Sequence, residues 1–202
     1  MGAFGGIIGK NFIAVIVALM MQFNVADATA VAPQDVAAEF MTGVTTCDEE
    51  YLQRYQDNQY VNFLLNIKAE TEAEKKLVKR LDKALFKNFT YEIVDYEQRE
   101  TAAVVKVEIK GNNFSKVLEN YEAVSYDYVT SNLYSETVED KQKLNEKCLE
   151  IYVEQVEKAA KKKPKHTATI YIPMLSNGSN GWDALATDEA MKEMFCGLKF
   201  PK

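Results

Sequence analysis

Residues 89–110 read FTYEIVDYEQRETAAVVKVEIK, and this stretch decides the fold. Apolar and polar residues alternate along it twice, over 89–96 and again over 103–110. A period of two residues is typical of a strand with one buried and one wet face. The short polar segment 97–100 between the two runs predicts an antiparallel hairpin. In the second strand we expect Val105, Val107 and Ile109 to face the core and Lys106, Glu108 and Lys110 to face water, because a slip of one residue would bury three charges.

Helical patterns precede the hairpin. Pro33 begins a first helix that we expect to end near Thr46, and acidic residues 48–50 begin one or two short helices over 51–67. The segment 71–87 (TEAEKKLVKRLDKALFK) places leucines on one face and Lys and Glu on the other. Thr71 and Glu74 have the spacing of a capping box, so a helix is expected here.

Helical spacing returns after the hairpin. Gly111 and the two asparagines after it end the second strand, and residues 114–163 carry two helices that form an insertion. Residues 167–175 (TATIYIPML) predict a third strand, in which Pro173 suggests an edge position. We expect Thr187 to cap a last short helix and Gly197 to end it.

The first thirty residues have the order of a secretory signal peptide. A single Lys10 precedes an apolar run over 12–23, and the small residues 26–30 (ADATA) follow it. The run is short for a membrane span, so cleavage before Thr29 or Val31 is expected, with an uncleaved anchor as the alternative. Neither junction has a cysteine that could carry a lipid. The prediction is thus a signal peptide over 1–30 and a single α+β domain over 31–202, secreted or associated with the cell envelope.

Composition excludes several functions. Charged residues make up 27% of the chain and hydrophobic residues 47%, which are ordinary values for a globular protein. The net charge is −6. An acidic domain is repelled by phosphate backbones and anionic lipids, so we expect no nucleic-acid partner, and a membrane contact only if the first thirty residues stay attached.

Few residues could carry out catalysis. Cys47, Cys148 and Cys196 are widely spaced, and we interpret them as small buried hydrophobic residues, with one disulfide as the alternative. His166 is the only histidine and is expected at the surface beside lysines. We therefore predict no bound cofactor, no metal site and no catalytic residues.

The order of elements resembles a group of exported proteins and lipoproteins of Gram-positive bacteria that belong to the cystatin-like, nuclear-transport-factor-2-like superfamily. Tyr91, the alternation over 103–107, Trp182 and the Gly197-Leu198 pair carry this resemblance. It implies an α+β fold in which N-terminal helices pack on a curved antiparallel sheet, the cystatin-like cone, with a helical insertion between strands. Members include enzymes and binding modules, so the resemblance implies no single activity.

Two functional hypotheses follow. The first is a module that binds a protein, a peptide or a cell-wall component, and its tentative surface consists of aromatic residues: Tyr91, Tyr121, Tyr126, Tyr128 and Trp182. Aromatic side chains with a polar end often line such sites. The alternative is a cofactor-free isomerase or lyase of the cone type. That reaction would need a buried carboxylate with a raised pKa, for which the strands offer Asp95 beside Tyr91 or Tyr96.

Overall fold

The structure is a computed structural model, and it describes residues 31–67, 69–178 and 181–201. The predicted signal peptide and its cleavage positions lie outside these residues. The described part of the chain consists of helices and the strands of one antiparallel sheet, so the predicted α+β class is confirmed.

The sheet is open and has four described strands in the order β1-β2-β3-β4, each antiparallel to its neighbours. Their bounds are β1 Thr90–Gln98, β2 Ala102–Gly111, β3 His166–Ser176 and β4 Trp182–Ala184. The predicted hairpin is β1 with β2, and the predicted third strand is β3. Three-residue β4 was not predicted, because it is too short to show a period in the sequence.

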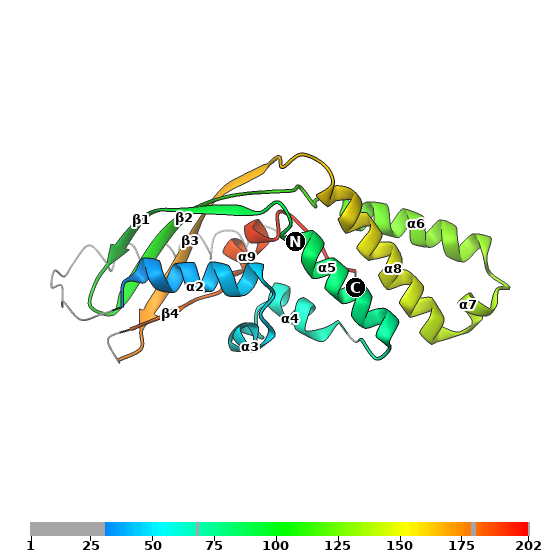
Figure 1. The fold of residues 1–202 in the computed structure, drawn as a ribbon, viewed down its shortest axis with the longest axis horizontal. Helices are drawn as coiled ribbons and strands as arrows, with labels where there is room; N and C mark the ends of the chain where they lie inside the picture. Colours follow the sequence, from blue (N-terminus) through cyan, green and yellow to red (C-terminus); the bar gives the residue numbers. More distant parts are fainter. Residues whose placement is uncertain (1–30, 68, 179–180, 202) are drawn as a thin grey trace, which may run out of the picture.

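Two helices cover one face of the sheet, α2 (Pro33–Thr45) and α9 (Asp188–Met194). Figure 1 shows α2 running along the sheet, with α9 near its middle. The predicted register of β2 is confirmed, since Val105 and Val107 are fully buried and Ile109 is 3% exposed. These strand residues belong to the same buried cluster as Phe40 and Met41 of α2. Burial of such apolar side chains is the main force that holds the layers together.

The helical insertion lies between β2 and β3, as predicted. It consists of α6 (Val117–Ser131), the short α7 (Glu136–Glu139) and α8 (Lys141–Ala160). In Figure 1 these helices extend away from the turn of the β1–β2 hairpin, so the molecule is elongated. Helix α5 (Glu72–Leu85) packs against α8, and Arg80 forms a two-point ion pair with Glu157, with N to O distances of 2.9 and 2.8 Å.

Short helices connect α2 to α5. They are α3 (Glu49–Leu52), the 3₁₀ helix η1 (Gln53–Tyr55) and α4 (Gln59–Asn66). Asp48 caps α3 and Asn58 caps α4, each accepting a hydrogen bond from a free backbone N–H of the first turn. The capping box of Thr71 and Glu74 at the start of α5 is present as predicted. Local sequence thus explains where these helices begin.

Two asparagine side chains connect the end of β2 to the end of α8 through hydrogen bonds. Asn112 is 2% exposed, and its side-chain amide donates to the carbonyls of Ala159 (3.3 Å) and Lys162 (2.6 Å). Asn88 donates to the side-chain oxygen of Asn112 and to the carbonyl of Ala160. The last carbonyls of a helix have no partner inside it, so these amides complete the end of α8.

Cysteines occupy the left-handed position after two helices. Cys47 follows α2 with φ 52°, and Cys196 follows α9 with φ 51°. Each helix ends with the pair of backbone hydrogen bonds that characterises the Schellman motif, in which this position usually belongs to glycine. Gly197, expected to end the last helix, has φ 76° and directly follows Cys196.

Strand β1 differs from the prediction. We expected it to be half-buried, but only Ile93 is, and the other residues of the strand are exposed. The register also shifts between Ile93 and Asp95, where Val94 forms a bulge. Asp95 therefore lies opposite Lys106 on the outer face, instead of sharing the face of Ile93 as strict alternation predicted.

Pro173 of β3 pairs with Val104 of β2. Its carbonyl accepts a hydrogen bond from the backbone N–H of Leu185, where the pairing with β4 ends.

Candidate functional site

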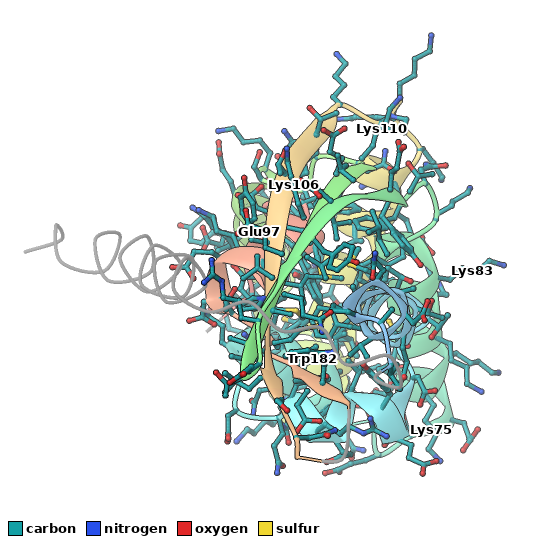
Figure 2. The ribbon with its side chains drawn as sticks, turned by 90° about the vertical axis from the view of Figure 1, so that its left-hand side faces the viewer. Lys75, Lys83, Glu97, Lys106, Lys110 and Trp182 are labelled. Carbon is teal, nitrogen blue, oxygen red and sulfur yellow. The ribbon has the colours of Figure 1, made fainter. Side chains whose placement is uncertain are left out.

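The five aromatic residues predicted as a partner surface do not come together. Tyr91 is on β1 and 36% exposed, and Tyr126 is on α6 and 70% exposed. Trp182 is on β4 in the buried cluster and only 7% exposed, so its assignment to a surface was wrong. Figure 2 shows Trp182 at the lower part of the sheet, away from Lys110 at the other end. The three residues of β4 are too few to show a period, and the local sequence could not reveal that helix α2 packs on this strand.

Two tyrosines of α6 face α8. The ring centre of Tyr121 lies 5.5 Å from that of Tyr152 of α8, with the planes nearly perpendicular. Tyr128 lies seven residues further along α6, on the same side, and the ammonium of Lys147 lies 5.5 Å from its ring centre. Tyr126 falls between them in sequence and points elsewhere, because a helix turns by about 100° per residue. Of the five predicted residues, Tyr91 lines a hollow on the sheet, Tyr128 lines a hollow between α5 and α8, and Tyr121 lines a third concave site.

That site is a groove between α4, α6 and α8, with a volume of about 430 Å³. Aromatic and aliphatic side chains form its walls, and its polar groups are three asparagine amides, two tyrosine hydroxyls and one thiol. The lining residues are Asn62, Phe63, Asn66, Ile67, Tyr121, Asn145, Cys148, Leu149, Tyr152 and Pro201. We call this hollow the α4–α8 groove.

A second hollow of about 460 Å³ continues the α4–α8 groove along α8. Both hollows are lined by Ile67, Asn145 and Leu149. The second hollow adds charged and polar groups: Glu70, Glu74, Lys141 and Gln142. The combined surface therefore changes from aromatic and neutral at one end to charged at the other.

The phenols of the groove remain protonated. Burial raises the pKa of Tyr121, and the neighbouring Cys148 raises it further. Burial also raises the pKa of Tyr152, whose hydroxyl donates a hydrogen bond of 3.1 Å to the carbonyl of Lys199. Neutral hydroxyls and amides can donate and accept hydrogen bonds but do not supply charge. This chemistry suits recognition of a ligand that is itself neutral where it enters the groove.

Sequence reasoning missed the asparagines of the groove. Asn62 and Asn66 are four residues apart on α4, and Asn145 is on α8, more than seventy residues later. Polar residues at helical spacing are typical of any solvated helix face, so nothing in the sequence marked them. Their proximity depends on how α4 and α8 pack.

The three cysteines are all free thiols, so the disulfide alternative is excluded for them. Cys196 is buried, and burial raises its pKa to about 12. Cys47 is half-buried, and burial together with Asp82 raises its pKa as well. A thiol with a raised pKa is a poor nucleophile, which agrees with the interpretation of these two as packing residues.

His166 is not at the surface as expected. Its side chain is 18% exposed, and its Nε2 lies 3.0 Å from a carboxylate oxygen of Glu193 in the last helix. The pairing of β3 with β2 places His166 opposite Gly111, within reach of Glu193 of α9, and no local pattern indicated this contact.

The carboxylate that the enzyme hypothesis named, Asp95, is not one that the structure buries. Asp95 is exposed, and one of its oxygens accepts from the backbone N–H of Tyr96. Burial instead raises the pKa of Asp82, on α5, to about 6. Asp82 lines a separate hollow of about 370 Å³ together with three lysines, Lys79, Lys83 and Lys87. Within the ranges that the structure describes, no three His, Cys, Asp or Glu side chains are grouped so as to hold a metal ion.

The fold and the groove define an α+β protein with an open antiparallel sheet on one side and a helical groove on the other. No protein-family model matches the chain, and no curated protein sequence matches it. Among solved structures, the chain is similar to a putative lipoprotein (ycdA) of Bacillus subtilis, with 17% sequence identity and a TM-score of 0.44. The similarity covers 94% of this chain and 55% of that protein, so the chain spans about half the length of its structural neighbour.

In the described part of the chain, no helix is long and apolar enough to span a membrane.

Proposed function

We propose that this protein is a binding module of the cell envelope or the extracellular space, and that it takes a protein, a peptide or a cell-wall component into the α4–α8 groove. The signal-peptide pattern of residues 1–30 supports this location. The assignment to the cystatin-like superfamily is part of the same proposal. An open sheet with helices against one face is compatible with the cone of that superfamily.

The lining of the groove carries the proposal. The half-buried rings of Phe63 and Tyr121 offer contact area at a small entropic cost, because both are already packed against Tyr152, which is only 2% exposed. The exposed asparagine amides can form hydrogen bonds with donors and acceptors of a ligand. None of the residues that line the α4–α8 groove is an acid, a lysine, an arginine or a histidine. This set of groups favours recognition over acid–base catalysis, and we therefore propose that the protein is not an enzyme.

A groove-filling substitution tests the proposal. Asn145 lines both hollows and is exposed, so Asn145→Arg should fill the groove and leave the fold intact. Thr130→Arg is the matched control, because Thr130 is exposed on α6 and adds the same charge outside the groove. Two probes are used separately: a muramidase digest of purified cell wall, and a detergent-free extract of envelope proteins.

We expect the wild type and Thr130→Arg to retain the same component, and Asn145→Arg to bind it at least about tenfold more weakly. Alkylation of Cys148 gives a second measurement, because this half-buried thiol lines the groove and a bound ligand should protect it. Equal retention by the three proteins, or an unchanged rate of Cys148 alkylation with saturating ligand, would refute the groove as the binding site.

A further inference from the structure

Strand β1 is an edge strand whose side chains are mostly exposed, although helix α2 packs against part of it. It forms the margin of the sheet order, and no other described strand pairs with its free side (Figure 1). Large apolar side chains remain exposed on it, with Tyr91 at 36%, Val94 at 45% and Tyr96 at 42%. An exposed edge presents unpaired backbone N–H and C=O groups, which are a template for another strand.

The register separates the side chains of β1 into two faces. Residues that are directly opposite in an antiparallel pair point to the same side of the sheet. Tyr91, Ile93 and Tyr96 lie opposite the inward residues Ile109, Val107 and Val105 of β2. Glu92, Asp95 and Glu97 lie opposite Glu108, Lys106 and Val104, on the outer face. The edge thus combines an apolar inner side with an acidic outer side.

The charge of this edge is largely uncompensated. β1 contains three acids and no base. Asp95 has Lys106 across from it, but Glu92 faces another carboxylate and Glu97 faces a valine. None of the ion pairs found in the described residues includes an acid of β1. A second copy of β1 would bring more acids to the same place, so self-pairing is disfavoured.

We propose that β1 receives an extended segment of a partner protein as an added strand, and that basic and apolar residues alternate in this segment. Its basic residues lie beside Glu92, Asp95 and Glu97, and its apolar residues cover Tyr91, Ile93 and Tyr96. Main-chain hydrogen bonds provide the attachment, and the alternating side chains provide the specificity.

The bulge at Val94 sets the register of this contact. It divides β1 into the runs 90–93 and 95–98, and β2 pairs with both runs while Val94 has no residue opposite it. Bulges of this kind also discourage long flat edges from aggregating. An added strand that passes the bulge as β2 does reaches Glu92, Asp95 and Glu97, and its affinity depends strongly on the charge pairs and on ionic strength.

The test uses the full-length chain and a synthetic peptide in which lysine and valine strictly alternate. A second peptide has the same composition, with the lysines in one block and the valines in another. Fluorescence anisotropy measures binding, and hydrogen exchange reports which backbone amides become protected. Glu92→Lys/Asp95→Lys/Glu97→Lys reverses the charge of β1. Glu119→Lys/Glu122→Lys/Asp127→Lys makes the same change in net charge on exposed positions of α6.

We expect the alternating peptide to bind the wild type and the α6 variant alike and to protect amides within residues 90–98. Reversal of the β1 charges should weaken binding by at least about tenfold. Three results would each overturn the proposal: equal binding of the block peptide, equal loss with the α6 variant, or protection confined to α8 and the α4–α8 groove. The last result would leave the proposed function of the groove in place.

Discussion

The two strands of the β1–β2 hairpin have similar alternating patterns but very different degrees of burial. Both alternate apolar and polar residues, and they pair along most of their length. In β2 the inward residues Val105 and Val107 are completely buried, whereas in β1 only Ile93 is even half-buried. Helix α2 packs against β1, β2 and β4, and α9 packs against β3, but β1 lies at the margin of the sheet, where most of its side chains stay exposed. The difference teaches that alternation shows which face can be buried, while the neighbouring layer decides whether it is.

A charge on the inner face of β2 should have the largest effect. Val107→Asp places a carboxylate among fully buried side chains without a partner, and we expect it to lower the free energy of unfolding by about 4 kcal/mol. Denaturant unfolding measures the change. Glu108→Asn, on the exposed face of the same strand, is the control and should change stability little. Equal stability of the two variants would contradict the register of β2.

The connection from β2 to α8 should matter next. Asn112→Ala removes the amide that serves the carbonyls of Ala159 and Lys162, and it leaves the side chain of Asn88 with one acceptor fewer. Buried groups left without partners cost about 2 kcal/mol in total, which thermal or denaturant unfolding should show. Asn120→Ala, on the exposed side of α6, should be nearly neutral. A neutral Asn112→Ala would mean that α8 does not depend on β2 for its end.

Helix α5 contains a half-buried carboxyl, that of Asp82, whereas the carboxyls of β1 are all exposed. Burial raises the pKa of Asp82 from 3.8 to about 6, so the folded state keeps this proton over a pH range in which the unfolded chain releases it. Stability is therefore lost as the pH rises through this window, and the penalty is complete near neutrality. Asp82→Asn should remove it and stabilise the protein at neutral pH by about 1 kcal/mol, a value reduced for solvent screening of a half-buried group.

Unfolding experiments across the window test this prediction. The gain from Asp82→Asn should disappear below the ordinary pKa of an aspartate, where the carboxyl is protonated in both states. Asp95→Asn is the matched control because Asp95 is exposed. A difference between wild type and Asp82→Asn that does not depend on pH would rule out the titration of Asp82 as its cause.

The smallest effect is expected on β1, and it is the direct counterpart of the first prediction. Val94 is 45% exposed at the bulge, so Val94→Asp puts its charge into water and should change stability by about 0.5 kcal/mol or less. The measurement is the same denaturant unfolding as for Val107→Asp. If Val94→Asp were as destabilising as the β2 variant, β1 would have to be covered in solution and the comparison of the two strands would fail.

Much of the fold could be predicted from local patterns. The hairpin, the α5 helix with its capping box, and the helical insertion all follow from periodicity and from capping residues that act within a few positions along the chain. The inward set of β2 was predictable because the alternative would bury three charges. Such features depend on interactions between near neighbours or on a strict period, and both are written in the sequence.

The site depended on distant contacts. Tyr121 lines the α4–α8 groove but Trp182 is buried, and no pattern in the sequence indicated that Asn62, Asn66 and Asn145 lie close together. The residues that meet in the α4–α8 groove come from three helices far apart in sequence, and their packing is set by which apolar stripes find each other. The bulge in β1 escaped prediction for a similar reason, since it is a property of the pair of strands.

The sequence by itself determined the class of the fold, the order of its elements and the buried face of β2, because periodicity and capping are local and the burial of charges is costly. Only the tertiary structure decided that the side chains of β1 stay exposed at an edge, that Trp182 is internal and that a groove opens between α4 and α8. Burial is shared between residues distant in the chain, so the same alternating pattern can end in the core or at the surface.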